Sequence, residues 1–226
     1  MNLIVSLGVW ILDKKIISTF SDYANAIEGL SPTSLFRGIC DEEFELLPSL
    51  FRHRDLGDPK VKENNLMWVF RAQAKSHLMA MPSRDIEWLT IAQHHGLPTR
   101  LLDWSLSPLV ALFFAVKDDF ERDGAICVYD KKQFVKEENV NGEIDEIIAF
   151  FPSHATRRIF AQSGMFTLHP FGKPKLEKPD LTKYFIIEKK SKHSLLQMLV
   201  KFGIHHASMF PDLDGLCSYI KYVNKY

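Results

Sequence analysis

The chain has 226 residues, of which 46% are hydrophobic and 25% charged, a composition typical of a globular protein that buries a core. Lysine plus arginine equals aspartate plus glutamate at 28 each, so a broad basic surface for nucleic acid is not indicated, although a local patch would not show in this total. The three scattered cysteines cannot all pair and form no C-x-x-C motif, which favours a reducing, cytoplasmic compartment.

The apolar N-terminal stretch "MNLIVSLGVWIL" is shorter than the roughly 18 residues of a membrane helix and lacks a basic leader region and an A-x-A cleavage pattern. We therefore expect residues 1–19 to be an addition, a strand or helix, that packs on the body. A signal peptide is the less favoured alternative, and no membrane association is expected.

The next elements alternate between helix and strand. Residues 20–30 predict a helix capped by Ser21, and "LFRG" predicts a strand that ends at Gly38. Residues 45–53 predict a loop and short helix around Pro48. Residues 64–81 contain no proline or glycine, and they predict another helix.

A third helix is expected to begin at the N-cap Ser83 and to end before Gly96. Ile86, Leu89 and Gln93 fall on one face of it, at i, i+3 and i+7. An amide on the core side must be hydrogen-bonded, so Gln93 either braces the following loop or meets a ligand.

The segment "SPLVALFFAV", residues 107–116, begins with a capping serine and a proline at the first helical position and is then almost wholly apolar. It predicts a buried helix, and the segment before it, with Arg100 and Asp103, is expected to be a loop. Five side chains of the helix are expected to be mostly buried: Val110, Ala111, Leu112, Phe113 and Phe114.

The second half predicts strands at 124–130, 165–169 and 184–188 and helices at 153–164, capped by Ser153, at 194–203 and near the C-terminus after "FPDLDG". No period of 20–50 residues repeats. Mixed strands and helices without regular alternation favour a single α+β domain, with a mixed or antiparallel sheet and surrounding helices.

The sequence lacks the motifs of several common kinds of functional site. The pairs His94-His95 and His205-His206 are neighbours in sequence, and such neighbours on a helix point about 100° apart, so a metal site is not expected. No G-x-S-x-G nucleophile, Walker loop or G-x-G-x-x-G is present.

Polar side chains instead stand at the ends of predicted elements. Arg37 ends a strand, Arg100 and Asp103 precede the apolar helix, and Gln162 precedes the strand at 165–169. Such residues converge in the sites of many α+β proteins, so one cleft lined by Arg37, Gln93, Asp103 and Gln162 is expected. The alternative is an internal ion pair, Arg37 with Asp103 or Arg100 with Asp103, that only fixes the loops.

Six segments, "LFRG", "LLPSLFR", "QHHGLPTRLLDW", "ALFFAV", "RIFAQSGMF" and "FPDLDG", closely resemble the FRG domain of bacteria and phages in order and spacing. The resemblance implies that residues 20–226 form one FRG domain. It implies architecture more than activity, because the family has been largely without an assigned function.

A fainter resemblance is to ADP-ribosyltransferases, which carry an Arg on an early strand, a Ser-Thr-Ser strand before a helix, and a Glu opening a later strand. "LFRG", "LLDWSLSPLVALFFA" and "AQSGMF" are similar to these three elements, with Gln162 in place of the glutamate. The resemblance implies that Arg37 binds a pyrophosphate and that Ser105 holds the strands of the cleft, while Trp104 stacks on a ligand or only packs. Gln162 supplies no charge, so Asp103 would have to substitute.

The candidate catalytic residues are therefore Arg37, Gln162 and Asp103. The candidate substrate-binding residues are Gln93, His94, His95, Thr99, Arg100, Trp104 and Ser105. The sequence indicates no particular cofactor, and NAD is expected as a substrate. The expected ligand is a nucleotide or nucleic acid, and no particular protein partner is indicated.

The leading hypothesis is a cleft that binds an NAD-like nucleotide, with ADP-ribosyl transfer or NAD hydrolysis as its reaction and phage defence or toxicity as its context. One alternative is a non-catalytic module that binds nucleic acid or protein. Another is a metal-free nuclease that uses His94 or His95 with Arg100.

Overall fold

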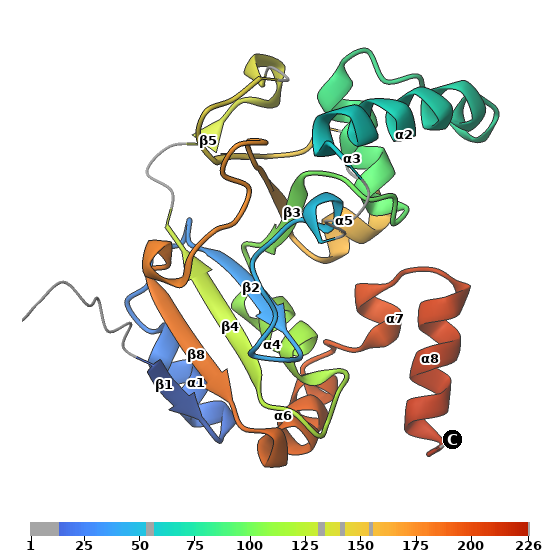
Figure 1. Cartoon of the computed structure of the whole chain (residues 1–226). Coiled ribbons are helices and arrows are strands. Elements are labelled where there is room, and N and C mark those ends of the chain that lie inside the picture. Colours follow the sequence, from blue (N-terminus) through green and yellow to red (C-terminus); the bar gives the residue numbers. More distant parts are fainter. Residues whose placement is uncertain (1–13, 53–56, 131–133, 141–142, 154–155, 226) are drawn as a thin grey trace, which may run out of the picture.

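The computed structural model of the chain describes residues 14–52, 57–130, 134–140, 143–153 and 156–225 (Figure 1). Of the N-terminal addition expected over residues 1–19, residues 1–13 lie outside the described residues, and Lys14–Ile17 forms a strand that pairs with the strand Lys183–Ile187. The strands are β1 (Lys14–Ile17), β2 (Leu35–Ile39), β3 (Leu101–Ser105), β4 (Gly124–Tyr129), β5 (Phe134–Val135), β6 (Ile148–Phe150), β7 (Gly164–Leu168) and β8 (Lys183–Ile187). The helices are α1 (Phe20–Ile27), α2 (Pro59–Ala74), α3 (Asp85–His94), α4 (Pro108–Val116), α5 (Arg157–Ala161), α6 (Lys189–Lys201), α7 (His206–Met209) and α8 (Leu213–Val223).

Within the described residues, the strands form one 8-stranded sheet in the order β1-β8-β4-β2-β3-β7-β6-β5. Pairing is antiparallel in the middle of the sheet and parallel at its two edges, where β1 pairs with β8 and β5 with β6. The chain is thus a single α+β domain with a mixed open sheet, and the predicted fold class is confirmed.

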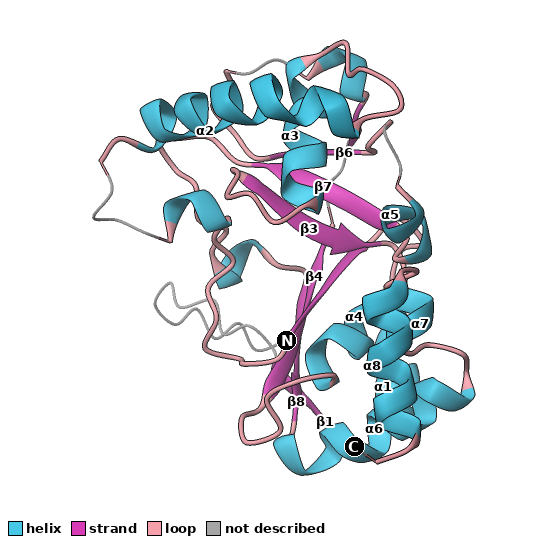
Figure 2. Ribbon diagram, turned by 90° about the vertical axis from the view of Figure 1, so that its right-hand side faces the viewer, coloured by secondary structure: helices cyan, strands magenta, loops and turns pink. Residues whose placement is uncertain are grey.

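The sheet consists of two halves that are joined loosely. β2 shares five register pairs with β4, and β3 shares five with β7, but β2 and β3 share only Phe36–Ser105. Figure 2 shows β3 and β7 running across the direction of β4 and β8. The two halves therefore diverge beyond this single pair, next to Arg37.

One half is covered by α1, α4 and α6, with α4 at the centre of the core. Ser107 accepts a hydrogen bond from the backbone N–H of Val110 and caps α4, as the sequence predicts. A Cβ built on Gly38 of β2 would lie 1.8 Å from the backbone oxygen of Ala111. Only glycine lets the helix backbone approach the strand this closely, which explains the glycine of "LFRG".

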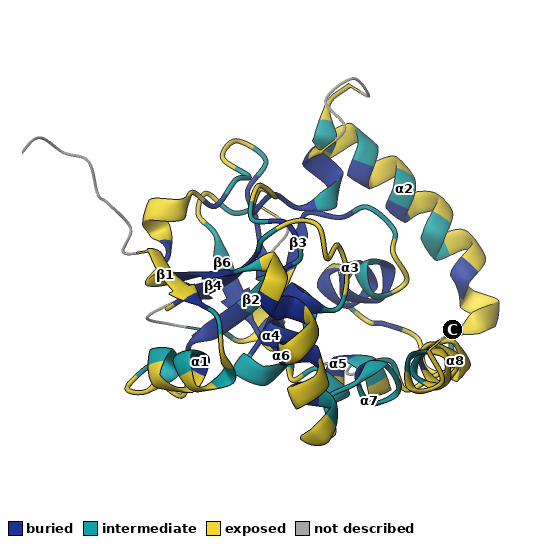
Figure 3. Cartoon of the chain, turned by 90° about the horizontal axis from the view of Figure 1, so that it is seen from below, coloured by how far each residue is buried: buried dark blue, intermediate teal, exposed yellow. Residues whose placement is uncertain are grey.

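The other half is covered by α2 and α3, which pack on side chains of β3, β6 and β7. Seen from below, α2 lies at the rim of the molecule with most of its surface exposed, whereas α3 lies deeper (Figure 3). No helix in the described part of the chain is long and apolar enough to cross a membrane.

Several predicted helix boundaries are wrong by a few residues. Thr19, not Ser21, caps α1 in a capping box with Asp22, and Thr156, not Ser153, caps α5. The helix expected over 64–81 begins at Pro59 and ends at Ala74, because Asp58 caps it and proline suits the first turn.

Two further starts differ from the predictions. Arg84 stands at the N-cap of α3 in place of Ser83, whose backbone N–H donates to the carboxylate of Glu87. The helix expected over 194–203 begins earlier, at Lys189.

The segment before α4 is a strand and not the predicted loop. Leu101–Ser105 pairs with β7 along its whole length, and Leu101, Leu102 and Trp104 are buried. Both faces of β3 contact apolar neighbours, so apolar residues stand next to each other in its sequence. The alternation of polar and apolar residues that identifies a half-exposed strand is therefore missing. Asp103 therefore stands on a fixed strand of the sheet.

Candidate functional site

A cleft of about 540 Å³ opens where β2 and β3 diverge, and residues of α3, α4, α5 and β7 complete its walls. Arg37, Gln93, Asp103 and Gln162 all line it. The expected juxtaposition of these four residues is thus confirmed, while their roles stay predictions. Phe36 and Gly38 line the cleft together with Arg37, although side chains alternate between the faces of a strand; this fits a cleft that passes through the gap in the sheet.

Arg37 is tied to Asp103 mainly through the backbone. Its Nη1 donates to the carbonyl oxygen of Asp103 at 2.6 Å, while the carboxylate Oδ2 lies 3.8 Å from the same nitrogen. The Nε of Arg37 is buried and has no hydrogen-bond partner among the described residues. Burial lowers the pKa of Arg37, and the nearby Asp103 opposes this only in part. A buried guanidinium that has an unused donor and only one distant carboxylate beside it can bind a further anion.

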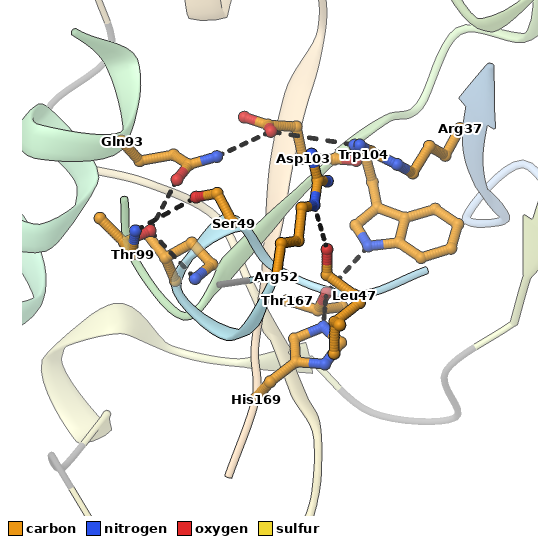
Figure 4. Close-up of polar contacts among 11 residues, drawn as sticks. Arg37, Leu47, Ser49, Arg52, Gln93, Thr99, Asp103, Trp104, Thr167 and His169 are labelled. Carbon is orange, nitrogen blue, oxygen red and sulfur yellow. Dashed lines mark hydrogen bonds and ion pairs between the residues drawn. The ribbon is translucent and has the colours of Figure 1, made fainter. Parts of the chain in front are cut away.

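A chain of hydrogen bonds holds Asp103 in place (Figure 4). Gln93 Nε2 donates to Asp103 Oδ2 at 2.8 Å, and the Gln93 Oε1 accepts from the hydroxyl of Thr99 at 2.6 Å. The backbone N–H of Thr99 in turn donates to Ser49 Oγ at 3.3 Å. Gln93 therefore braces the segment after α3, as one of the two predicted roles requires, and also orients the carboxylate in the cleft.

Asp103 keeps 56% of its side chain exposed, although its strand neighbours are buried. It is thus an oriented and accessible carboxylate beside Arg37. The predicted ion pair between Arg37 and Asp103 is present, but the two groups are far apart for an ion pair. The alternative pair, Arg100 with Asp103, is not formed, because Arg100 pairs with Glu63.

Ser105 and Gln162 connect β3 to the segment before β7. The Ser105 hydroxyl donates to the backbone oxygen of Gln162 at 2.7 Å, which fits the expectation that Ser105 holds the strands together. The side-chain Nε2 of Gln162 donates to the backbone oxygen of Met209 in α7 at 3.0 Å. This bond uses the amide nitrogen, so the Oε1 of Gln162, a residue that lines the cleft, stays an acceptor for a further hydrogen bond.

Trp104 is among the residues that line the cleft, and its side chain packs within the protein. Its side chain is buried, its Nε1 donates to Thr167 Oγ1 at 2.9 Å, and its ring lies 5.6 Å from that of Tyr129. Of the two roles that the sequence left open, stacking on a ligand or packing, the contacts are those of packing.

His94 and His95 line the cleft at the end of α3. His94 Nδ1 lies 3.3 Å from the hydroxyl of Thr156, and the two histidine rings contact edge to face. Burial, followed by the neighbouring His95 and Arg158, lowers the pKa of His94. Both histidines are available to a ligand, and His94 stays neutral at pH 7 unless an anion arrives beside it.

Thr99 and Arg100 do not reach the cleft. Thr99 is buried and acts through Gln93. Arg100 is buried against Glu63, at 3.0 Å, and over the ring of Phe171 in a separate cavity of about 200 Å³. The structure thus does not bring Arg100 together with the histidines, as the nuclease alternative requires.

One charged residue of the cleft was not predicted from the sequence. Arg158 of α5 lines the same cleft. It stands four residues before Gln162, so the two share a helix face, and this i, i+4 spacing is the signal that could have found it. No group of three or more His, Cys, Asp or Glu side chains among the described residues is arranged to hold a metal ion.

Fold and site together define an α+β protein whose divided sheet opens into an arginine-lined cleft. Residues 32–124 match the model of the FRG domain, so the chain contains an FRG domain. The match includes Arg37, Gln93 and Asp103 and ends before Arg158 and Gln162. The expectation that the domain extends over residues 20–226 stays a prediction. Neither a search of curated proteins nor a search of solved structures found a match.

Proposed function

We propose that the cleft binds an NAD-like dinucleotide and that the protein transfers ADP-ribose from it or hydrolyses it. Arg37 carries this proposal: a buried guanidinium with an unpaired Nε and only a distant carboxylate, open to a cleft of about 540 Å³. A planar guanidinium binds two phosphate oxygens at once, which suits a pyrophosphate.

The arrangement of the elements supports the same proposal. Arg37 lies on β2, the strand β3 leads directly into α4, and Gln162 precedes β7, in the order that the resemblance to ADP-ribosyltransferases implies. These strands are neighbours in the sheet, β2-β3-β7. The three elements thus meet around one cleft.

The reaction would break the bond between C1′ of the ribose and the nicotinamide nitrogen, which leaves with the bonding electrons. Water or an acceptor then attacks C1′ and loses a proton. The oxocarbenium-like transition state carries positive charge, and a carboxylate stabilises it. Gln162 offers only a hydrogen-bond acceptor, so we assign this task to Asp103, the accessible carboxylate that Gln93 orients. A role in phage defence or as a toxin is the biological context we propose, on the family resemblance.

The test combines calorimetric titration with NAD and ADP-ribose and an assay of nicotinamide release, on the wild type, Arg37→Lys and Gln162→Ala. We expect Arg37→Lys to weaken binding about ten- to a hundredfold, because an ammonium cannot reproduce the two-donor fork and each charge-assisted bond contributes roughly 1.5–3 kcal/mol. Gln162→Ala is expected to lower both affinity and rate. If the wild type binds neither compound at millimolar concentration, the proposal fails, and a non-catalytic module for nucleic acid or protein becomes the better account of the two cleft arginines.

A further inference from the structure

Arg158 and Arg37 reach the cleft from different parts of the fold. Arg158 belongs to α5, which packs on β7, whereas Arg37 belongs to β2, and β3 lies between these two strands in the sheet. His94 lies near both Arg158 and Asp103, since both change its pKa. Both arginines thus line the cleft that Asp103 and His94 also line.

The guanidinium of Arg158 lies on an aromatic platform. Its Cζ is 4.5 Å from the ring centroid of Phe210, which itself contacts the rings of Phe114, at 6.0 Å, and His206, at 6.3 Å. Stacking uses the face of the guanidinium, while the five N–H donors point outward in its plane. The contact positions Arg158 and leaves its donors for a ligand.

No carboxylate in the described part of the chain pairs with Arg158. Four other described arginines each have a carboxylate partner within 3.2 Å: Arg71, Arg84, Arg100 and Arg122. Arg52 and Arg157 have none, but both are exposed to water. Two half-buried arginines thus have no close carboxylate partner among the described residues. These two, Arg37 and Arg158, are the arginines that line the cleft.

We infer that Arg158 is a second anion-binding residue of the cleft and that the ligand is a nucleotide with a diphosphate, one phosphate on Arg37 and the other on Arg158. This inference rests on the proposed function, because it names the ligand class of the same cleft. A monophosphate engages one guanidinium and leaves the other unsatisfied. A diphosphate engages both, and since both guanidinium groups are already held by contacts within the protein, less conformational entropy is lost on binding.

The experiment is calorimetric titration of the full chain with ADP-ribose and with AMP, in the wild type, Arg158→Gln and Arg157→Gln. Arg157 is the matched control, since it lies next in the helix and its loss changes the net charge equally, but it is exposed. We expect Arg158→Gln to weaken ADP-ribose binding about ten- to a hundredfold. AMP binding should fall much less, so the preference for the diphosphate shrinks, whereas Arg157→Gln should stay within about twofold of the wild type.

Two further measurements keep the outcomes separate. Arg158→Lys keeps the charge but loses the planar fork, and an affinity between those of the wild type and Arg158→Gln supports the inference even if the Gln variant melts at a lower temperature. If Arg158→Gln binds ADP-ribose as well as Arg157→Gln does, the inference is overturned while the proposed function stands. If the wild type binds no nucleotide, titration with inorganic pyrophosphate decides: binding that Arg158→Gln loses supports the second anion site, and no binding overturns it.

Discussion

Arg37 holds Asp103 by the backbone and not by the carboxylate: Nη1 lies 2.6 Å from the carbonyl oxygen and 3.8 Å from Oδ2. The carbonyl bond fixes the guanidinium beside β3, at the point where the two halves of the sheet diverge. The carboxylate is free to give up its long ion pair to an incoming anion, and Gln93 still orients it at 2.8 Å. This arrangement combines a positioned cation with an accessible anion.

Replacement of Asp103 by Asn should separate binding from chemistry. Asn keeps an oxygen for Gln93 but removes the negative charge that competes for Arg37, so ADP-ribose affinity is expected to rise by a few-fold. Nicotinamide release is expected to fall by about a hundredfold or more, because the transition state loses its stabilising charge. Titration and the release assay on the same preparation check both, and a variant with undiminished release would remove Asp103 from the reaction.

Gln162→Glu restores the residue that the resemblance to ADP-ribosyltransferases implies, and from sequence alone it should raise the rate. The structure adds an opposing effect, because Gln162 Nε2 donates to the backbone oxygen of Met209 and a carboxylate there would face a carbonyl. We expect a loss of stability of about 1–3 kcal/mol from this unsatisfied acceptor. Any gain in nicotinamide release should therefore be seen only below the melting temperature of the variant, which we expect to be lowered. If the melting temperature is unchanged, the packing of α7 does not depend on this bond.

Phe113 and Phe114 should differ in their contribution to stability. Phe113 is fully buried, whereas Phe114, which the sequence predicts to be mostly buried, is half-buried because it lines the cleft. Phe113→Ala is expected to lower the free energy of unfolding by about 3–5 kcal/mol, as a core truncation does. Phe114→Ala should cost about 1–2 kcal/mol, since less of its surface leaves water. Urea unfolding of both variants checks this, and equal losses would mean that the cleft is closed in solution.

Stability should fall in acid because of a buried histidine. Trp104 Nε1 donates to Thr167 Oγ1, whose hydroxyl lies 2.8 Å from His169 Nε2, while His169 Nδ1 lies 2.7 Å from the Pro174 oxygen and must donate to it. His169 is therefore neutral, and burial lowers its pKa to about 4 from 6.5.

The unfolded chain thus binds a proton that the folded chain does not bind between these two pH values, so the free energy of unfolding decreases as pH falls through this range. The loss amounts to roughly 3 kcal/mol, because a tenfold difference in proton affinity between the folded and unfolded chains corresponds to about 1.4 kcal/mol. Urea unfolding between pH 7 and pH 4 measures it. His169→Gln keeps a donor and an acceptor without titrating, and its stability should depend less on pH than that of the wild type; parallel curves would assign the acid loss to other groups.

Local signals in the sequence predicted much of the fold. The capping Ser107, the proline after it and the apolar run fix α4 as a buried helix, because these preferences act within one turn. "LFRG" as a strand and the mixture of elements without regular alternation were sufficient for the α+β class. The polar residues that the sequence indicates do line one cleft, but the expected reason was wrong for two of them. Arg37 and Asp103 lie in the middle of β2 and β3, and the cleft opens beside them because these strands diverge.

Long-range contacts decided the rest. Leu101–Ser105 has no clear strand periodicity, and it becomes a strand because β7 pairs with it and both of its faces are covered. Arg100 and Asp103 are close neighbours in sequence, yet one lies buried against Glu63 and the other faces the cleft. The guanidinium of Arg158 stacks on Phe210, which lies far along the chain, and local sequence does not indicate this contact.

Local sequence determines most helices and strands through short-range hydrogen bonds and side-chain periodicity, although not β3. The partner that each charged group finds depends on packing between distant segments. In the described part of the chain, that packing leaves two arginines of one cleft, Arg37 and Arg158, without a close carboxylate.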